Sequence, residues 1–167
     1  MRFLCNLFLL LFLTGTLVFA GDEVDLFQVA REGNAAQMSE MIASGADLKG
    51  KDVSGRNALM QAVVFGNQAT TLVLLANSPD LESKDGFGLS PLTLSVRYGD
   101  AEMTKILLEH GASVKSTMED GSTPLIFAAL EGQISAVRLL LEYNSAVNFR
   151  TNYGESALIV ASFEGYL

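Results

Sequence analysis

The sequence predicts an all-α solenoid of stacked helix pairs with short β-turn fingers, in about four and a half repeats of 33 residues. The first observation is a column of turn glycines at this period: Gly55, Gly88, Gly121 and Gly154. The second is a column of leucines: Leu26, Leu59, Leu92, Leu125 and Leu158. The third is a column of helix-ending glycines: Gly33, Gly66, Gly99, Gly132 and Gly165. Columns that keep one period without insertions are typical of a repeat array.

One stretch, 120–132, shows how the turn and the first helix of a unit are encoded. Gly121 provides the permissive backbone of a tight turn. Thr123 can cap a helix with its hydroxyl, and Pro124 occupies the first helical position, where its missing N–H costs nothing. Gly132 then ends a helix of about two turns.

A second helix follows in each complete unit. Its apolar positions repeat at the same period: Met41-Ile42, Leu74-Leu75, Leu107-Leu108 and Leu140-Leu141. In the first unit this helix, near 35–44, is more polar than its counterparts, which suits a terminal unit whose outer side meets water. We therefore expect a repeat domain over 21–167, divided into units 21–51, 52–84, 85–117 and 118–150 and a partial unit 151–167.

These columns resemble the ankyrin-repeat family, whose unit carries a Thr-Pro-Leu-His-x-Ala type motif. The resemblance covers residues 24–167 and includes small exported bacterial ankyrin proteins. Thr123-Pro124 keeps the Thr-Pro pair of the motif, and Ser90-Pro91 is close to it. The His of the motif is replaced in every unit, by Met60, Thr93, Ile126 and Ile159. In the family this His serves hydrogen bonding between neighbouring loops, so its loss predicts a softer stack with the same fold.

The partial unit has a turn and a first helix but no second helix. Two explanations are open for it. The sequence is incomplete, or the exposed Leu158, Val160 and Ala161 are covered by a partner or by a second copy of the chain.

Residues 1–20 predict a secretory signal peptide. One basic residue, Arg2, precedes an apolar run, and Val18 and Ala20 occupy the −3 and −1 positions before Gly21. The protein is then periplasmic or secreted, with no membrane association after cleavage. The alternative is a membrane anchor through an uncleaved N-terminal segment, because 18 mostly apolar residues nearly span a bilayer.

Composition and motifs exclude several functions. The formal net charge of −8 argues against a nucleic-acid partner. The single cysteine, Cys5, lies in the signal segment, so the rest of the chain has no thiolate chemistry, disulfide or Cys-based zinc site. The single histidine, His110, is expected at the solvent-facing end of a second helix, with no partner arranged for nucleophilic catalysis. We predict no enzyme activity, no catalytic residue, no cofactor and no metal site.

The resemblance implies a concave binding surface made of turn tips and the exposed side of the first helices. The period places these candidate protein-binding residues there: Arg56, Phe65, Phe87, Leu89, Arg97, Tyr98, Leu130, Tyr153 and Phe163. A solvent-facing repeat position has no structural need for an aromatic ring, and interface energy concentrates in aromatic and Arg anchors. The alternative is that some of these rings fold against adjacent turns and complete the core.

These inferences predict a non-enzymatic module that binds another protein through its concave surface. The resemblance suggests two narrower roles. One is an accessory factor for an exported enzyme, for example in oxidative-stress defence, and the other is a secreted effector that binds host proteins. The open half unit at 151–167 also allows self-association.

Overall fold

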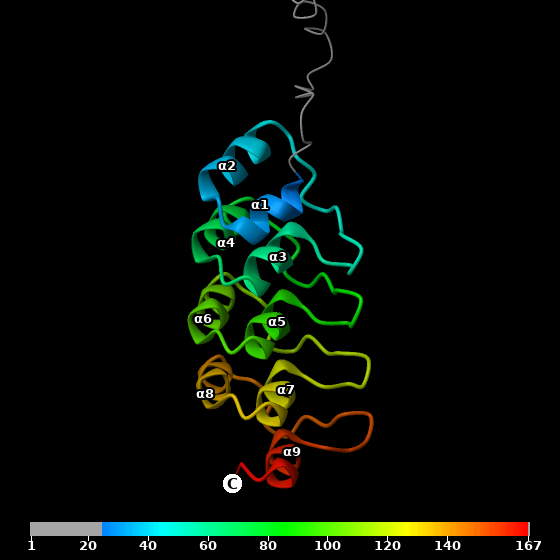
Figure 1. Cartoon of the computed structure of the whole chain (residues 1–167). Helices are drawn as coiled ribbons and strands as arrows, with labels where there is room; N and C mark the ends of the chain where they lie inside the picture. The colour runs from blue at the N-terminus through cyan, green and yellow to red at the C-terminus, as the bar shows by residue number, and fades with distance from the viewer. Residues whose placement is uncertain (1–24, 167) are drawn as a thin grey trace, which may run out of the picture.

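The computed structural model describes residues 25–166, so the expected signal peptide at 1–20 lies outside the described residues. The helices form two parallel rows (Figure 1). The inner row, beside the loops, contains α1 (Leu26–Glu32), α3 (Ala58–Val64), α5 (Pro91–Arg97), α7 (Pro124–Leu130) and α9 (Ala157–Glu164). The outer row contains α2 (Ala35–Ala43), α4 (Gln68–Leu75), α6 (Ala101–Glu109) and α8 (Ile134–Glu142). Residues 25–166 contain no strand, and the predicted all-α repeat solenoid is confirmed.

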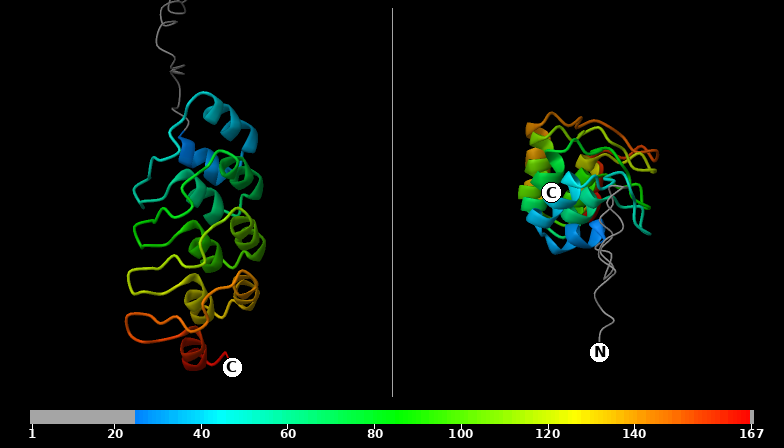
Figure 2. Two further views of the ribbon diagram at one scale, coloured as in Figure 1. Left: turned by 180° about the vertical axis from the view of Figure 1, so that it is seen from behind. Right: turned by 90° about the horizontal axis from the view of Figure 1, so that it is seen from above.

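The chain stacks its units in sequence order. Each inner-row helix contacts the next one in the row, and α1, α3, α5 and α7 each also contact the outer-row helix that follows. The long loops between units project to one side of the stack as fingers, which is clearest from behind and from above (Figure 2). Because each unit touches only its neighbours, the exposed side chains of successive units form continuous lines along the stack.

Short polar residues begin the inner-row helices as the sequence predicts. Thr123 caps α7 by accepting the N–H of Ile126, and Pro124 is the first helical residue. Ser90 and Pro91 do the same for α5. Asn57 and Ser156 cap α3 and α9 without a following proline. The caps satisfy backbone donors that a helix of two turns would otherwise leave open.

A side chain from the second unit caps the C-terminal end of α1 in the first unit. The Asn67 amide donates to the carbonyls of Ala30 and Arg31, both at 2.8 Å. Gly33 follows these carbonyls with φ of 78°, and a Cβ added there would lie 2.6 Å from Asn67 Oδ1. The backbone angle therefore favours glycine at position 33, and a larger residue would also displace the Asn67 amide from its two bonds.

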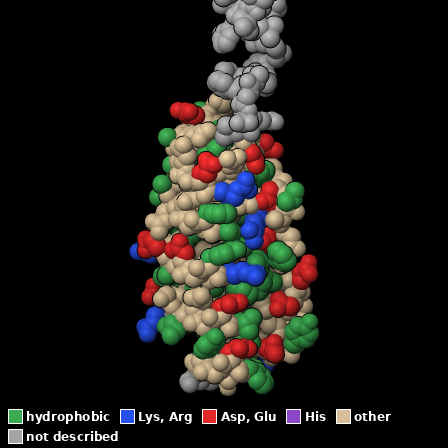
Figure 3. Space-filling model, in the orientation of Figure 1, with side chains coloured by type: hydrophobic (Ala, Val, Ile, Leu, Met, Phe, Trp, Pro, Cys, Tyr) green, Lys and Arg blue, Asp and Glu red, His purple; other side chains and the backbone are tan. Residues whose placement is uncertain are grey.

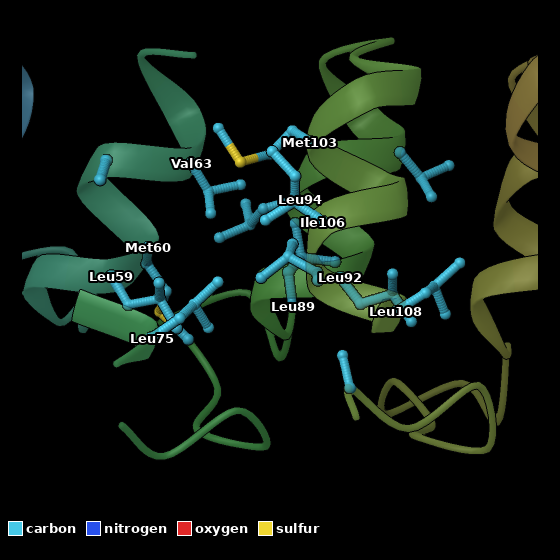
Figure 4. Close-up of a cluster of buried hydrophobic side chains, with 14 of the residues drawn as sticks. Leu59, Met60, Val63, Leu75, Leu89, Leu92, Leu94, Met103, Ile106 and Leu108 are labelled. Carbon is cyan, nitrogen blue, oxygen red and sulfur yellow. The ribbon is translucent and has the colours of Figure 1, made fainter. Parts of the chain in front are cut away.

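The core lies between the two rows. The central leucines Leu59, Leu92 and Leu125 are at most 3% exposed. Figure 4 shows Leu59 of α3, Leu92 of α5 and Ile106 of α6 among the side chains that fill the space between neighbouring helices. Complete burial of one such side chain contributes about 2 kcal/mol.

Hydrogen bonds between consecutive fingers hold the loops in line. The Lys51 ammonium donates to the Lys84 carbonyl at 2.8 Å, and the Lys84 ammonium donates in the same way to the Thr117 carbonyl. Near the tips, the Gly86 N–H donates to the Ser54 carbonyl at 2.8 Å. This regular spacing fixes where the exposed tip residues stand relative to the inner-row helices.

Candidate functional site

The predicted aromatic positions lie at the finger tips and at the ends of the inner-row helices. Phe87 and Tyr153 stand at finger tips and are 71% and 78% exposed, so these rings do not complete the core. We call this surface the aromatic face, and define it by its exposed members: Val53, Phe65, Phe87, Arg97, Tyr98, Leu130, Tyr153 and Phe163. Figure 3 shows hydrophobic side chains reaching the surface along the inner row and the fingers, with basic side chains between them.

The inner-row members of the aromatic face share one position in the repeat. Phe65 and Tyr98 follow the last residues of α3 and α5, and Leu130 ends α7. Phe163 lies in the last turn of α9. A glycine follows within two residues and ends each of these short helices. The side chains just before these glycines lie outside the core packing and are exposed.

The prediction that Leu89 belongs to an exposed binding surface is wrong. Leu89 is 3% exposed and joins the core. Its N–H donates to the Asp85 carboxylate at 3.0 Å, and its carbonyl accepts the Asp85 N–H at 3.0 Å. These bonds close the finger and return the chain toward α5, so the residue after the turn glycine points inward.

Arg56 occupies the same repeat position and is also drawn inward. Its side chain is 17% exposed and forms an ion pair with Asp85, from Nε to Oδ2 at 3.3 Å. The guanidinium therefore connects two fingers, and only a small part of it reaches the aromatic face. The exposed cation of this face is Arg97, which forms no ion pair within residues 25–166.

Val53 extends the aromatic face beyond the residues predicted from the sequence. It is fully exposed at the tip of the first finger. The available signal for Val53 is an apolar residue at a tip position, which the predicted aromatic, arginine and leucine anchors did not include. Its neighbours on the tip are held by the Asp52 carboxylate, which accepts the N–H groups of Ser54 and Arg56 at 2.8 and 3.0 Å.

The electrostatics of the first finger centre on Asp52. Burial by itself raises the pKa of this carboxyl. The N–H groups of Arg56 and Ser54, the Gln61 amide and the Arg56 charge outweigh burial and hold the pKa of Asp52 below its ordinary value of 3.8. The ionised carboxylate is thus part of the folded finger at neutral pH.

The end of the stack at α9 differs from its expectation in two residues, Val160 and Ala161. Leu158 and Phe163 are exposed, but Val160 is 8% exposed and packs inward. Val160 is the buried residue of α9, and α9 packs against α7. The expectation of an exposed Val160 and Ala161 was therefore wrong, because Val160 is buried and Ala161 is half-buried, while Leu158 is exposed as expected.

The described residues offer little for chemistry. His110 caps the end of α6, and its Nδ1 lies 2.8 Å from the Ile106 carbonyl. Residues 25–166 contain no cluster of three or more His, Cys, Asp or Glu side chains placed to hold a metal ion. Within the same residues, every helix is too short or too polar to span a bilayer.

Two rows of short helices, stacked unit on unit beside a line of fingers, define a helical repeat scaffold. A model of ankyrin repeats in three copies matches residues 26–118 and 110–167, and the chain belongs to the ankyrin-repeat family. A search of curated proteins found no match. Ankyrin repeats are generally protein–protein interaction modules, and the family is typically non-enzymatic.

Proposed function

We propose that the protein is a non-enzymatic interaction module that binds a partner protein through the aromatic face. The observation that carries this proposal is the exposure of apolar rings at two repeat positions: Phe65 and Tyr98 occupy one of them in successive units, and Phe87 and Tyr153 occupy the other two units apart. Exposed apolar side chains gathered on one face favour association, because burying them against a partner removes them from water. Aromatic side chains are also the commonest anchors of protein interfaces.

The experiment begins with a crosslinked pull-down of the protein from its source cells, with mass spectrometry of the captured proteins. The purified partner is then titrated against Phe87→Ala and Tyr153→Ala. We expect each substitution to weaken binding by more than about 1 kcal/mol, or roughly fivefold in Kd. Thermal stability should barely change, because both rings are exposed.

The matched control is Tyr143→Ala, which removes an exposed ring at the end of α8 in the outer row. It should leave binding unchanged. Loss of stability with unchanged binding in the Phe87 and Tyr153 variants would contradict the proposal. If only self-crosslinks appear, and they map to α9, the partner is a second copy that covers the exposed Leu158 and Phe163.

We also propose that the protein acts outside the cytoplasm, as the sequence pattern of residues 1–20 supports. There it would be an accessory factor for an exported enzyme, or an effector that binds host proteins. Cell fractionation separates these roles, because an effector accumulates in the culture fluid and a periplasmic factor does not. Recovery of the uncleaved chain in the membrane fraction would support the anchored alternative.

A further inference from the structure

The charges of the aromatic face are divided along the stack. Two segments, 52–66 and 85–99, contain the fingers and inner-row helices of its first half. Their charged residues are Asp52, Arg56, Asp85 and Arg97. The corresponding segments of the second half, 118–132 and 151–165, contain no Lys or Arg. Their charged residues are Glu119, Asp120, Glu131, Glu155 and Glu164.

The two acids of the first half are used inside the fingers. The side chain of Asp85 is fully buried, accepts the N–H groups of Phe87 and Leu89, and pairs with Arg56. The Asp52 carboxylate accepts the N–H groups of its own finger. The charge that this half presents to a partner is therefore the exposed guanidinium of Arg97.

The second half presents carboxylates. Met118 and Thr151 replace the finger aspartates there, and the Thr151 hydroxyl accepts the finger N–H groups instead. Glu119, Glu131 and Glu164 are exposed and take part in none of the three ion pairs formed within residues 25–166. The basic side chain next to these segments is the exposed Arg150, whose Nη1 donates to the Gly154 carbonyl at 2.6 Å and forms no ion pair within residues 25–166.

One repeat position shows the change directly. Within the aromatic face, Phe65 and Tyr98 occupy it after α3 and α5, and Glu131 and Glu164 occupy it at the ends of α7 and α9. The first unit, outside this face, has the exposed Glu32 at the same position. Apolar anchors continue beside the acids, because Leu130 and Phe163 directly precede them and are exposed. The aromatic face is thus a narrow line of apolar side chains with a cation in its first half and carboxylates in its second.

We infer that the occupant of the aromatic face is one continuous segment of a partner protein with divided charge. Its acidic residues lie over α3 and α5, its basic residues over α7 and α9, and its apolar side chains contact the rings. Opposite charges across an interface speed association and fix register, whereas like charges placed together are strongly unfavourable. A uniformly acidic segment is rejected by the second half. This inference rests on the proposed function, because it names the chemistry of the partner at the same face.

The test is selection of a random-peptide phage library on the purified protein. We expect the enriched peptides to carry an acidic block and a basic block with apolar residues between them. A synthetic copy of the most enriched peptide is then compared with a copy that has the same composition and alternating charges. We expect the alternating copy to bind about tenfold more weakly at low salt, and the difference to shrink as salt is raised.

Charge-reversal variants assign the two blocks. Arg97→Glu and Glu131→Lys should each weaken the divided peptide by about three- to tenfold, since each puts a like charge opposite one block. The matched controls are Arg138→Glu and Glu142→Lys on α8 in the outer row, which should leave binding unchanged. Circular dichroism should show the same helix content and melting for all four variants.

Three outcomes overturn the inference. Enriched peptides without divided charge, or a divided peptide that is indifferent to Arg97→Glu and Glu131→Lys, refute the charge assignment. In either case, if Phe87→Ala and Tyr153→Ala still weaken binding of the enriched peptides, the proposed function stands and only the charge assignment fails. If these two variants have no effect either, both proposals fail. A selection that enriches no peptide shows that the partner is not one continuous segment, and the pull-down then decides the proposed function alone.

Discussion

Arg56 and Asp85 join the first two fingers by an ion pair of 3.3 Å in which the Asp85 carboxylate is completely buried. The same carboxylate accepts the N–H groups of Phe87 and Leu89, so one side chain both shapes its own finger and ties it to the finger before it. The exposed ring of Phe87 is held at the finger tip through this arrangement. The ion pair therefore stabilises the finger that carries Phe87, and it adds little exposed surface to the aromatic face.

The first prediction concerns this pair. Arg56→Gln should lower the free energy of unfolding by about 2 kcal/mol, because it leaves a buried carboxylate without its cation. Urea unfolding followed by circular dichroism measures the change. The control, Lys105→Gln, breaks the exposed pair with Glu109 and should cost less than about 0.5 kcal/mol. Equal losses in the two variants would show that the buried pair has no special role.

The second prediction concerns a buried hydroxyl. Thr71 of α4 is fully buried, and its hydroxyl has no hydrogen-bond partner within the described residues. At the equivalent place one unit later, the Thr104 hydroxyl lies 2.9 Å from that of Ser95. Thr71 lacks such a partner because Ala62 stands where Ser95 does.

Replacing Thr71 by valine, which has the same shape, should stabilise the protein by about 1 kcal/mol in thermal or urea unfolding. Thr104→Val should destabilise it by a similar amount, because it removes the bonds to Ser95 and to the Asp100 carbonyl. Ala62→Ser, which supplies a partner for Thr71, should reduce the gain from Thr71→Val. A loss of stability in Thr71→Val would refute the explanation.

The third prediction concerns acid. The folded protein holds the pKa of Asp52 below its ordinary value of 3.8. The ionised carboxylate therefore contributes stability that is complete above the unfolded pKa and is lost as the pH falls through the lower, folded pKa. Asp52→Asn abolishes this titration, so the stability difference from wild type should be constant near pH 7 and shrink below about pH 4.

Urea unfolding of both proteins from about pH 7 to about pH 3 measures this difference. Asp47→Asn is a suitable control, because Asp47 is exposed in a loop of the first unit, where its carboxylate accepts only the Lys49 N–H at 2.9 Å. The expectation would be wrong if the difference in unfolding free energy between wild type and Asp52→Asn grew in acid. That result would show that the fold disfavours the ionised form of Asp52.

Local sequence determined the helices, their ends and the family. Turn glycines, capping residues such as Thr123 and first-turn prolines act within a few residues of themselves, and the period repeats them in each unit. The aromatic positions were also predictable, because residues just before the helix-ending glycines and at the finger tips have few neighbours. Phe87 and Tyr153 are exposed for this reason.

Only the tertiary structure decided which candidates turn inward. Leu89 and Arg56 share a repeat position that sequence reasoning placed on the surface, but finger closure directs Leu89 into the core and the buried Asp85 of the next unit draws Arg56 inward. Val160 is the buried residue of α9, which packs against α7, the inner-row helix one unit earlier in the chain. Whether such a side chain is buried depends on the residues of the neighbouring unit that it contacts. These contacts form between units, so the sequence of one unit does not determine them.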